Sequence, residues 1–305
     1  MPILTIDTVT KRYGKFTAVD KASFEARPGR ILGLLGPNGA GKTSTIRMIA
    51  NITAADEGEI RLDEKPVGPW VQRHLGYLPE ERGLYKKLKV SEQLLYFAQL
   101  RGLRRDDATG RIRHWLKRFD MEKWAASKTQ ELSKGMQQKI QFISTILPDP
   151  DLLILDEPFS GLDPINSELL RDIILEQKDA GRTILFASHR MEQVEQLCDD
   201  ICLIAEGRIL VHGSLRDIKN SFGRDSINLE FEGDGAFLDP FVSSGQIRIT
   251  SRTHHSAEIR LLNGAPARNI LEAAVNHTDA LYRYELVMPS LSEIFISLVE
   301  GKSAA

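Results

Sequence analysis

Short apolar runs separated by helical patterns dominate the first part of the chain. The runs Arg30–Leu35 and Leu152–Leu155 are bounded by Gly or Asp, and their shortness is typical of buried strands rather than helices. Further strands are predicted at Ile3–Val9, Ala22–Ala26, Thr183–Ala187 and Ile201–Ala205. Helical patterns over Ser167–Ala180 and Met191–Cys198 separate the later runs. Strands that alternate with helices in this way predict an α/β sheet.

A helical block over about residues 84–147 interrupts this pattern. Its first helix is expected to begin at Ser91 as N-cap, and a second is expected over Ala108–Phe119. A third helix should begin after Ser133 and end before Pro148. We therefore expect a helical subdomain inserted into a first domain of residues 1–222.

The pattern changes after this domain, and we expect a second domain over residues 223–305. Strands are predicted at Ser226–Phe231, Gln246–Thr250, Glu258–Leu262 and Leu281–Val287, and helices at Ala265–Asn276 and Ser290–Val299. The order suggests a small α+β domain of the β-α-β-β-α-β kind.

Composition narrows the class of protein without naming a function. The chain has 305 residues, of which 42% are hydrophobic and 27% charged, and a formal net charge of -2. These values exclude a disordered or collagen-like chain and argue against a nucleic-acid-binding protein that is basic overall. Two cysteines imply no disulfide framework. No apolar run could span a bilayer, and the N-terminus lacks a signal-peptide layout, so we expect a cytoplasmic chain.

The helical block carries most of the local positive charge. Residues 84–124 contain 11 Lys or Arg against 5 Asp or Glu. Such a cluster is either an ordinary solvated helix face or a surface that meets a membrane or an acidic partner.

A phosphate-binding loop lies at the end of the first buried run. Gly36–Thr43 matches G-x-x-x-x-G-K-[ST], with a strand before it and a helix after it. Glycines let the backbone fold around an anion, and the helix N-terminus adds a favourable partial charge. Lys42 would contact the β- and γ-phosphates, and the Thr43 hydroxyl suits Mg²⁺. The alternative is a Gly-rich turn that binds nothing.

An acidic pair follows the second buried run. Asp156 would hold Mg²⁺ directly or through water, and Glu157 would polarise the attacking water as general base. Taken alone, such a pair would be an ordinary surface turn. Together with the phosphate-binding loop, it predicts hydrolysis of a nucleoside triphosphate.

From about Leu4 to Ser214, the motifs and their order resemble the ATP-binding subunits of ABC transporters. Leu132–Gln138, which reads LSKGMQQ, is similar to that family's signature, usually LSGGQ. Ser160–Pro164 resembles its D-loop, and Ser188-His189 resembles its switch histidine. The resemblance implies a P-loop ABC ATPase domain with an inserted helical subdomain, followed here by the small α+β domain.

The resemblance also implies roles for single residues. Tyr13 would stack on adenine, His189 would contact the γ-phosphate and hold the attacking water, and Asp163 would act across a dimer interface. The remaining ATP contacts would come from Gly36, Pro37, Asn38, Gly39, Ala40, Gly41, Lys42, Thr43 and Ser44. The signature residues Ser133, Lys134, Gly135 and Met136 would bind ATP held by the opposite subunit. Lys42, Glu80, Glu157 and His189 are the expected catalytic residues, and Thr43, Glu80 and Asp156 the expected metal ligands.

Three positions depart from the family pattern. Glu80 stands where the family usually has the Q-loop glutamine; its oxygen can still hold Mg²⁺ or water, but it adds a negative charge. Lys134 replaces the second signature glycine, and Met136 replaces the signature glutamine.

Residues 77–85, which read YLPEERGLY, make the resemblance narrower. With the signature and the closing segment Met288–Phe295, they resemble the sodium-extrusion and multidrug exporter branch, which carries an accessory C-terminal domain. The expected protein is an ATP-binding subunit that hydrolyses ATP with Mg²⁺ to drive export. Its expected partners are an integral-membrane permease, which holds it at the inner face of the membrane, and a second copy or a related ATPase, with no nucleic acid. The alternative is a soluble ABC ATPase that acts on ribosomes or DNA.

Overall fold

The structure is a computed structural model that describes residues 3–81, 83–223 and 225–303. The chain divides into two compact units, Met1–Ser214 and Leu215–Ala305. This division falls somewhat earlier than the expected one, because α7 (Leu215–Ser221) follows the last strand of the first unit directly and belongs to the second.

A six-stranded sheet, in the order β10-β9-β3-β8-β7-β6, forms the centre of the first unit. Its strands are β3 (Ile31–Leu35), β6 (Leu75–Leu78), β7 (Leu152–Asp156), β8 (Thr183–Ser188), β9 (Asp200–Ala205) and β10 (Arg208–Ser214). All neighbours are parallel except β10, which pairs antiparallel with β9. Every residue of β3, β7, β8 and β9 is buried, which explains why these strands consist mostly of consecutive apolar residues.

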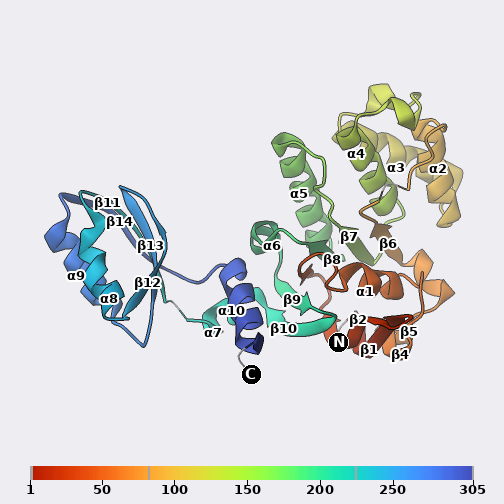
Figure 1. Ribbon diagram of the computed structural model, residues 1–305. Helices are drawn as coiled ribbons and strands as arrows, with labels where there is room; N and C mark the ends of the chain where they lie inside the picture. The colour runs from red at the N-terminus through yellow and green to blue at the C-terminus, as the bar shows by residue number, and fades with distance from the viewer. Residues whose placement is uncertain (1–2, 82, 224, 304–305) are drawn as a thin grey trace. The chain divides into compact units, whose positions relative to one another are not determined.

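A second, antiparallel sheet in the order β2-β1-β4-β5 lies below the first in Figure 1. It contains β1 (Leu4–Tyr13), β2 (Phe16–Ala26), β4 (Glu57–Leu62) and β5 (Lys65–Pro66). The helix α1 (Lys42–Ile49) lies between the two sheets (Figure 1). Ile46 and Ile49 are fully buried in the core cluster that joins α1 to both sheets. This packing fixes the start of α1 at the end of β3.

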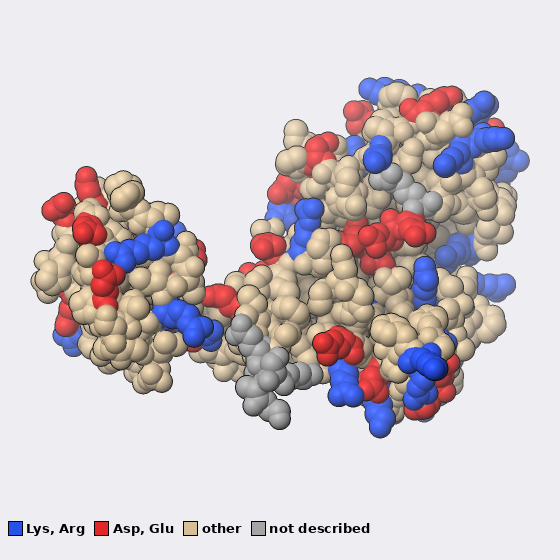
Figure 2. All heavy atoms as spheres, in the orientation of Figure 1, with Lys and Arg blue, Asp and Glu red and all other residues tan. Residues whose placement is uncertain are grey.

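Helices cover the rest of the first unit. They are α2 (Val90–Leu100), α3 (Arg105–Arg118), α4 (Lys134–Ile146), α5 (Pro164–Asp179) and α6 (Met191–Leu197). Short 3-10 helices cover Pro69–Arg73, Glu122–Trp124 and Thr129–Glu131. Figure 2 shows blue side chains spread over the outer side of α2–α4, in agreement with the excess of Lys and Arg in residues 84–124.

The prediction that Ser91 caps the first of these helices is wrong. Lys89 is the N-cap of α2, and Ser91 lies inside the first turn. The Glu92 side chain, at the third helical position, accepts a hydrogen bond from the Lys89 backbone N–H at 3.2 Å, so the helix begins two residues earlier than expected. The prediction for the third helix is confirmed, because Ser133 caps α4, which ends at Ile146.

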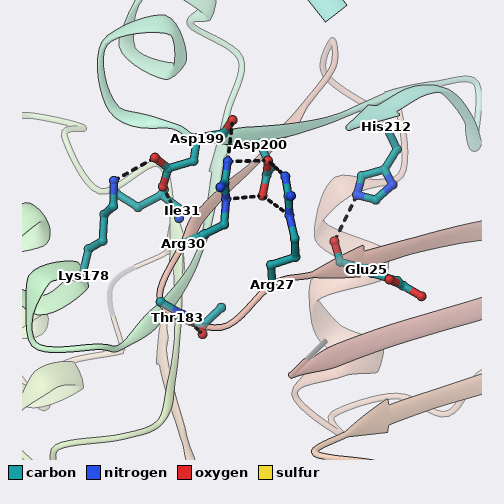
Figure 3. Close-up of polar contacts among 10 residues, drawn as sticks. Glu25, Arg27, Arg30, Ile31, Lys178, Thr183, Asp199, Asp200 and His212 are labelled. Carbon is teal, nitrogen blue, oxygen red and sulfur yellow. Dashed lines mark hydrogen bonds and ion pairs between the residues drawn. The ribbon is translucent and has the colours of Figure 1, made fainter. Parts of the chain in front are cut away.

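An ion-pair network ties the amino ends of the parallel strands together (Figure 3). Asp200, the first residue of β9, accepts hydrogen bonds from Nε of Arg27 at 3.0 Å and Nε of Arg30 at 2.8 Å. Its neighbour Asp199 accepts from Nζ of Lys178 at 2.8 Å and from the Ile31 backbone N–H at 3.0 Å. These contacts join the start of β3, the end of α5 and the start of β9.

The second unit has its own core around a four-stranded antiparallel sheet in the order β12-β13-β11-β14. Its strands are β11 (Ser226–Glu232), β12 (Ile247–Arg252), β13 (Ser256–Leu261) and β14 (Ala280–Val287), and its further helices are a 3-10 turn (Gly235–Leu238), α8 (Asp239–Ser243), α9 (Ala267–His277) and α10 (Leu291–Ser303). The element order from β11 to β14 is the β-α-β-β-α-β order that the sequence suggested. Among the residues that the structure describes, no helix combines the length and the apolar character that crossing a bilayer requires.

Candidate active site

The loop between β3 and α1 can be built only with glycine at two positions. Gly36 has a φ of +156°, and a Cβ there would lie 2.1 Å from the Ile204 carbonyl oxygen. Gly41 has a φ of +110°, and a Cβ there would lie 2.5 Å from the Ala18 carbonyl oxygen. Neither approach is possible for another residue, so the loop curves tightly at both positions.

Lys42 lies inside this loop at the first turn of α1. Its Nζ donates to the carbonyl oxygen of Gly36 at 2.6 Å and to that of Pro37 at 3.1 Å. Burial lowers the pKa of Lys42, and the charges of Glu157, Asp156 and Glu80 oppose that shift. The ammonium group is therefore held in the loop by backbone dipoles and placed near three carboxylates.

Asp156 ends β7 and is 2% exposed. Its Oδ2 atom is buried and has no hydrogen-bond partner among the described residues. Burial and, to a smaller extent, the negative charges of Glu80 and Glu157 raise the pKa of Asp156 to about 6. An uncompensated oxygen of this kind, at the carboxyl end of a parallel strand, is available to a cation or a ligand.

Glu157 is held in one orientation by the end of β8. The Ser188 hydroxyl donates to Glu157 Oε2 at 3.1 Å, and the His189 backbone N–H donates to Oε1 at 2.8 Å. Nδ1 of His189 lies 2.6 Å from the same oxygen. The backbone of Glu157 has a φ of +50°, an uncommon value for a residue with a side chain and typical of functional sites.

These elements surround a cavity of about 410 Å³ at the carboxyl ends of the parallel strands. Its lining residues are Tyr13, Phe16, Ala18, Asn38, Gly39, Ala40, Gly41, Lys42, Thr43, Ser44, Glu80, Asp156, Glu157 and His189. Gly36 and Pro37 are not among them, although their carbonyl groups hold Lys42. Most of the predicted ATP-site residues of this chain therefore come together from five separate segments.

Sequence reasoning missed Phe16 and Ala18. Tyr13 and Phe16 face each other across the two-residue turn of the β1–β2 hairpin, and they are 45% and 62% exposed. Gly14, with a φ of +61°, makes this turn possible. The signal in the sequence was a Gly-containing pair of residues between two aromatics, which marks a hairpin that carries both rings to its tip.

The signature and D-loop residues lie outside this cavity. Ser133 caps α4 by accepting a hydrogen bond from the Met136 backbone N–H at 3.3 Å. A Cβ on Gly135 would lie 3.2 Å from the Gly161 carbonyl oxygen, so the signature and the D-loop lie side by side. Asp163 caps α5 by accepting from the Asn166 backbone N–H at 2.9 Å, a bond that lowers the pKa of Asp163. Ser133, Lys134, Gly135, Met136 and Asp163 are thus near one another but absent from the lining of the cavity.

The cavity fits a divalent cation only in part. In the described part of the chain, no group of three or more His, Cys, Asp and Glu side chains could hold a metal ion. The unpartnered oxygen of Asp156 and the hydroxyl of Thr43 suit Mg²⁺, which usually takes one or two carboxylates and completes its shell with substrate phosphates and water. The residues present therefore fit a cation that arrives with a phosphate ligand.

Both units match known protein families. Residues 19–160 match the family described as "ABC transporter", and residues 213–299 match the family described as "ATP-binding protein DrrA1-3-like, C-terminal domain". The protein of Bacillus subtilis (strain 168) named "Uncharacterized ABC transporter ATP-binding protein YhaQ" is 43% identical over 297 residues, which are 97% of this chain and 98% of that protein.

A second relative and a solved structure are also named as ATP-binding proteins of transport or export systems. The "Nod factor export ATP-binding protein I" of Burkholderia pseudomallei (strain K96243) is 37% identical over 262 residues, 81% of this chain and 84% of that protein. A solved structure described as "Structure of ATP binding subunit of ABC transporter" superimposes with a TM-score of 0.69 and 32% identity, covering 72% of this chain and 93% of that one. This similarity confirms the expected fold class.

Proposed function

The chain belongs to the ABC transporter ATP-binding proteins, and on that premise we propose that it hydrolyses ATP in the cavity at the carboxyl ends of β3 and β7 to drive export through a separate membrane permease. Proteins of this family hydrolyse ATP to power transport, and they work as dimers with membrane permeases. The single observation that carries the proposal is the meeting of the loop lysine, two strand-end carboxylates and His189 around one cavity.

Several residues of this cavity have roles in the proposed reaction. Tyr13 would stack on the adenine ring, the loop backbone and Lys42 would bind the phosphates, and Thr43 and Asp156 would hold Mg²⁺. The chemistry that Mg²⁺ would supply there is to offset the charge of the β- and γ-phosphates. Glu157 takes the proton of the attacking water, and His189 orients the carboxylate of Glu157 through the contact at 2.6 Å.

The position of the signature supports a site shared by two chains. Ser133 and Gly135 lie at the N-terminus of α4 and do not line the cavity of their own chain, so this N-terminus would be able to contact phosphates held by another chain. The D-loop residue Asp163 lies beside them and would act at the same interface. ATP would then favour a closed pair of subunits, and hydrolysis would favour its opening.

Export is supported by the relative named for Nod factor export and by the match of residues 213–299 to a DrrA1-3-like C-terminal domain. The proposal of the sodium-extrusion and multidrug exporter branch rests on the resemblance carried by residues 77–85 and Met288–Phe295. The permease would hold the chain at the membrane, and the partner ATPase would be a second copy or a related subunit.

The partner is tested by purifying a tagged chain from native membranes and identifying what accompanies it by mass spectrometry. We expect a protein with several membrane spans and no ATPase of its own. The Glu157→Gln variant is the control, since it should keep this partner while it loses turnover. Ribosomal proteins or DNA in place of a membrane partner would contradict the proposal.

The direction of transport is tested by comparing the medium of cells that carry the wild-type chain or the Glu157→Gln variant. A compound that is released only with the wild-type chain is expected. A compound that only wild-type cells take up from the medium would show import instead.

A further inference from the structure

The cavity contains more negative than positive side chains. Three carboxylates line it, those of Glu80, Asp156 and Glu157, against the single ammonium group of Lys42 and the imidazole of His189. All three carboxylates raise the pKa of Lys42, so their charges act on the same space in which phosphates would bind. Figure 2 shows acidic side chains gathered in red near the centre of Met1–Ser214, below the helices α2–α4.

Two of these three carboxylates lack a full set of hydrogen-bond or ion-pair partners among the described residues. Glu157 is paired with His189 and Ser188, but Oδ2 of Asp156 has no partner among the described residues. The exposed side chain of Glu80 makes no hydrogen bond or ion pair within the described residues. Arg47 is a further cation whose charge reaches Asp156, but it does not line the cavity.

This arrangement repels a nucleotide that arrives without a cation. A triphosphate carries several negative charges, and each carboxylate a few ångströms away opposes its binding. A divalent cation reverses the sign of this effect, because it draws the carboxylates and the phosphates to itself. The buried, unpartnered oxygen of Asp156 is the atom in the cavity that most needs such a cation.

We propose that Glu80 makes the cavity selective for the metal complex of ATP over metal-free ATP. A glutamine at this position would offer the same oxygen as a ligand but would not repel free phosphates. Glu80 thereby selects between metal-bound and metal-free ATP at the binding step, before hydrolysis begins. This inference rests on the proposed function, because it assumes that the cavity binds ATP.

The neighbouring Glu81 provides a matched control. It is exposed like Glu80 and carries the same charge one residue further along, but it does not line the cavity. Glu80→Gln and Glu81→Gln therefore remove the same charge from two adjacent surface positions, and only the first should change the cavity. Glu80→Ala separates the loss of charge from the loss of the ligand oxygen.

The test is calorimetric titration of the full chain with a non-hydrolysable ATP analogue, in excess Mg²⁺ and in excess EDTA. The wild-type chain and Glu81→Gln should bind the metal complex at least about 100-fold more tightly than the free analogue. Glu80→Gln should reduce that ratio about tenfold by binding the free analogue more tightly, and Glu80→Ala should act in the same direction.

A ratio for Glu80→Gln that equals the wild-type ratio would overturn the inference, and so would an equal reduction in Glu81→Gln. The failure of the proposed function would look different. In that case the wild-type chain would not bind the analogue even with Mg²⁺, and Lys42→Ala would change nothing.

Discussion

Two buried aspartates lie at opposite ends of the same parallel sheet, and their surroundings differ. Asp156 is the last residue of β7 and Asp200 the first residue of β9; they are 2% and 3% exposed. Two arginines, Arg27 and Arg30, donate several hydrogen bonds to Asp200 (Figure 3). Asp156 has one buried oxygen without a hydrogen-bond partner in the described part of the chain, and its pKa is raised to about 6.

The difference shows how one sheet separates stability from function. A buried charge that the chain itself compensates holds elements together, as Asp200 holds the β2–β3 turn to β9. A buried charge that the chain leaves uncompensated is unfavourable until a ligand arrives. The parallel strands all end on one side of the sheet, and the carboxylate without a full set of partners lies there, beside the phosphate-binding loop. Changes at the two edges should therefore have different effects.

The largest effect is expected at the carboxyl edge. Glu157→Gln should reduce ATP turnover by a factor of about 10²–10⁴, because a positioned general base contributes about that much. The folded protein should keep its stability, since glutamine fits the same space. Release of phosphate measures turnover, and light scattering after gel filtration with ATP should show a trapped dimer. Turnover as fast as that of the wild-type chain would remove Glu157 from the mechanism.

At the amino ends of the strands, a substitution should reduce stability and leave ATP turnover unchanged. Asp200→Asn should lower the free energy of unfolding by about 2–3 kcal/mol, because it removes the charge that Arg27 and Arg30 share. This loss of stability is smaller than that expected for a fully buried ion pair, because both arginines are partly exposed to solvent. Urea denaturation measures it, and turnover per folded molecule should not change. A variant as stable as the wild-type chain would contradict the structural role of this network.

Asp156→Asn should raise the free energy of unfolding at neutral pH, whereas Asp200→Asn should lower it. The raised pKa means that the folded state holds its proton to about pH 6, whereas the unfolded chain releases it near 4. Stability from this group is therefore present at acid pH and lost as pH rises through 6, by roughly 1–3 kcal/mol. In metal-free buffer, the variant should be more stable than the wild-type chain at pH 7.5 and no more stable at pH 4. Urea denaturation at both values checks this, and a variant less stable at pH 7.5 would contradict it.

The smallest effects concern the hairpin tip. Tyr13→Ala should weaken binding of an ATP analogue about tenfold, because stacking of a base on an aromatic ring contributes about 1–3 kcal/mol. Phe16→Ala should weaken it less, about threefold, because Phe16 is not the ring proposed to stack on adenine. Lys15→Ala, in the turn between them, is the control and should bind normally. Fluorescence titration measures all three. Equal affinities for all variants would show that the base binds elsewhere.

Local motifs were predictable from the sequence, whereas long-range pairs were not. Gly36–Thr43 and Asp156-Glu157 carry their chemistry in adjacent residues, and they follow buried strands that could also be predicted. The pairing of Arg30 with Asp200 joins positions separated by 170 residues, and no local pattern indicates it. Phe16 was missed because the predicted strands stopped short of the hairpin tip.

The contrast between the two aspartates is tested most directly by the stabilisation that MgATP gives to metal-free protein. Saturating MgATP should raise the free energy of unfolding of the wild-type chain and of Asp200→Asn by the same amount, about 2.7 kcal/mol at 100 times the dissociation constant. In Asp156→Asn the effect should fall to that of ATP with EDTA. Equal stabilisation of Asp156→Asn by MgATP, or none in Asp200→Asn, would contradict the account.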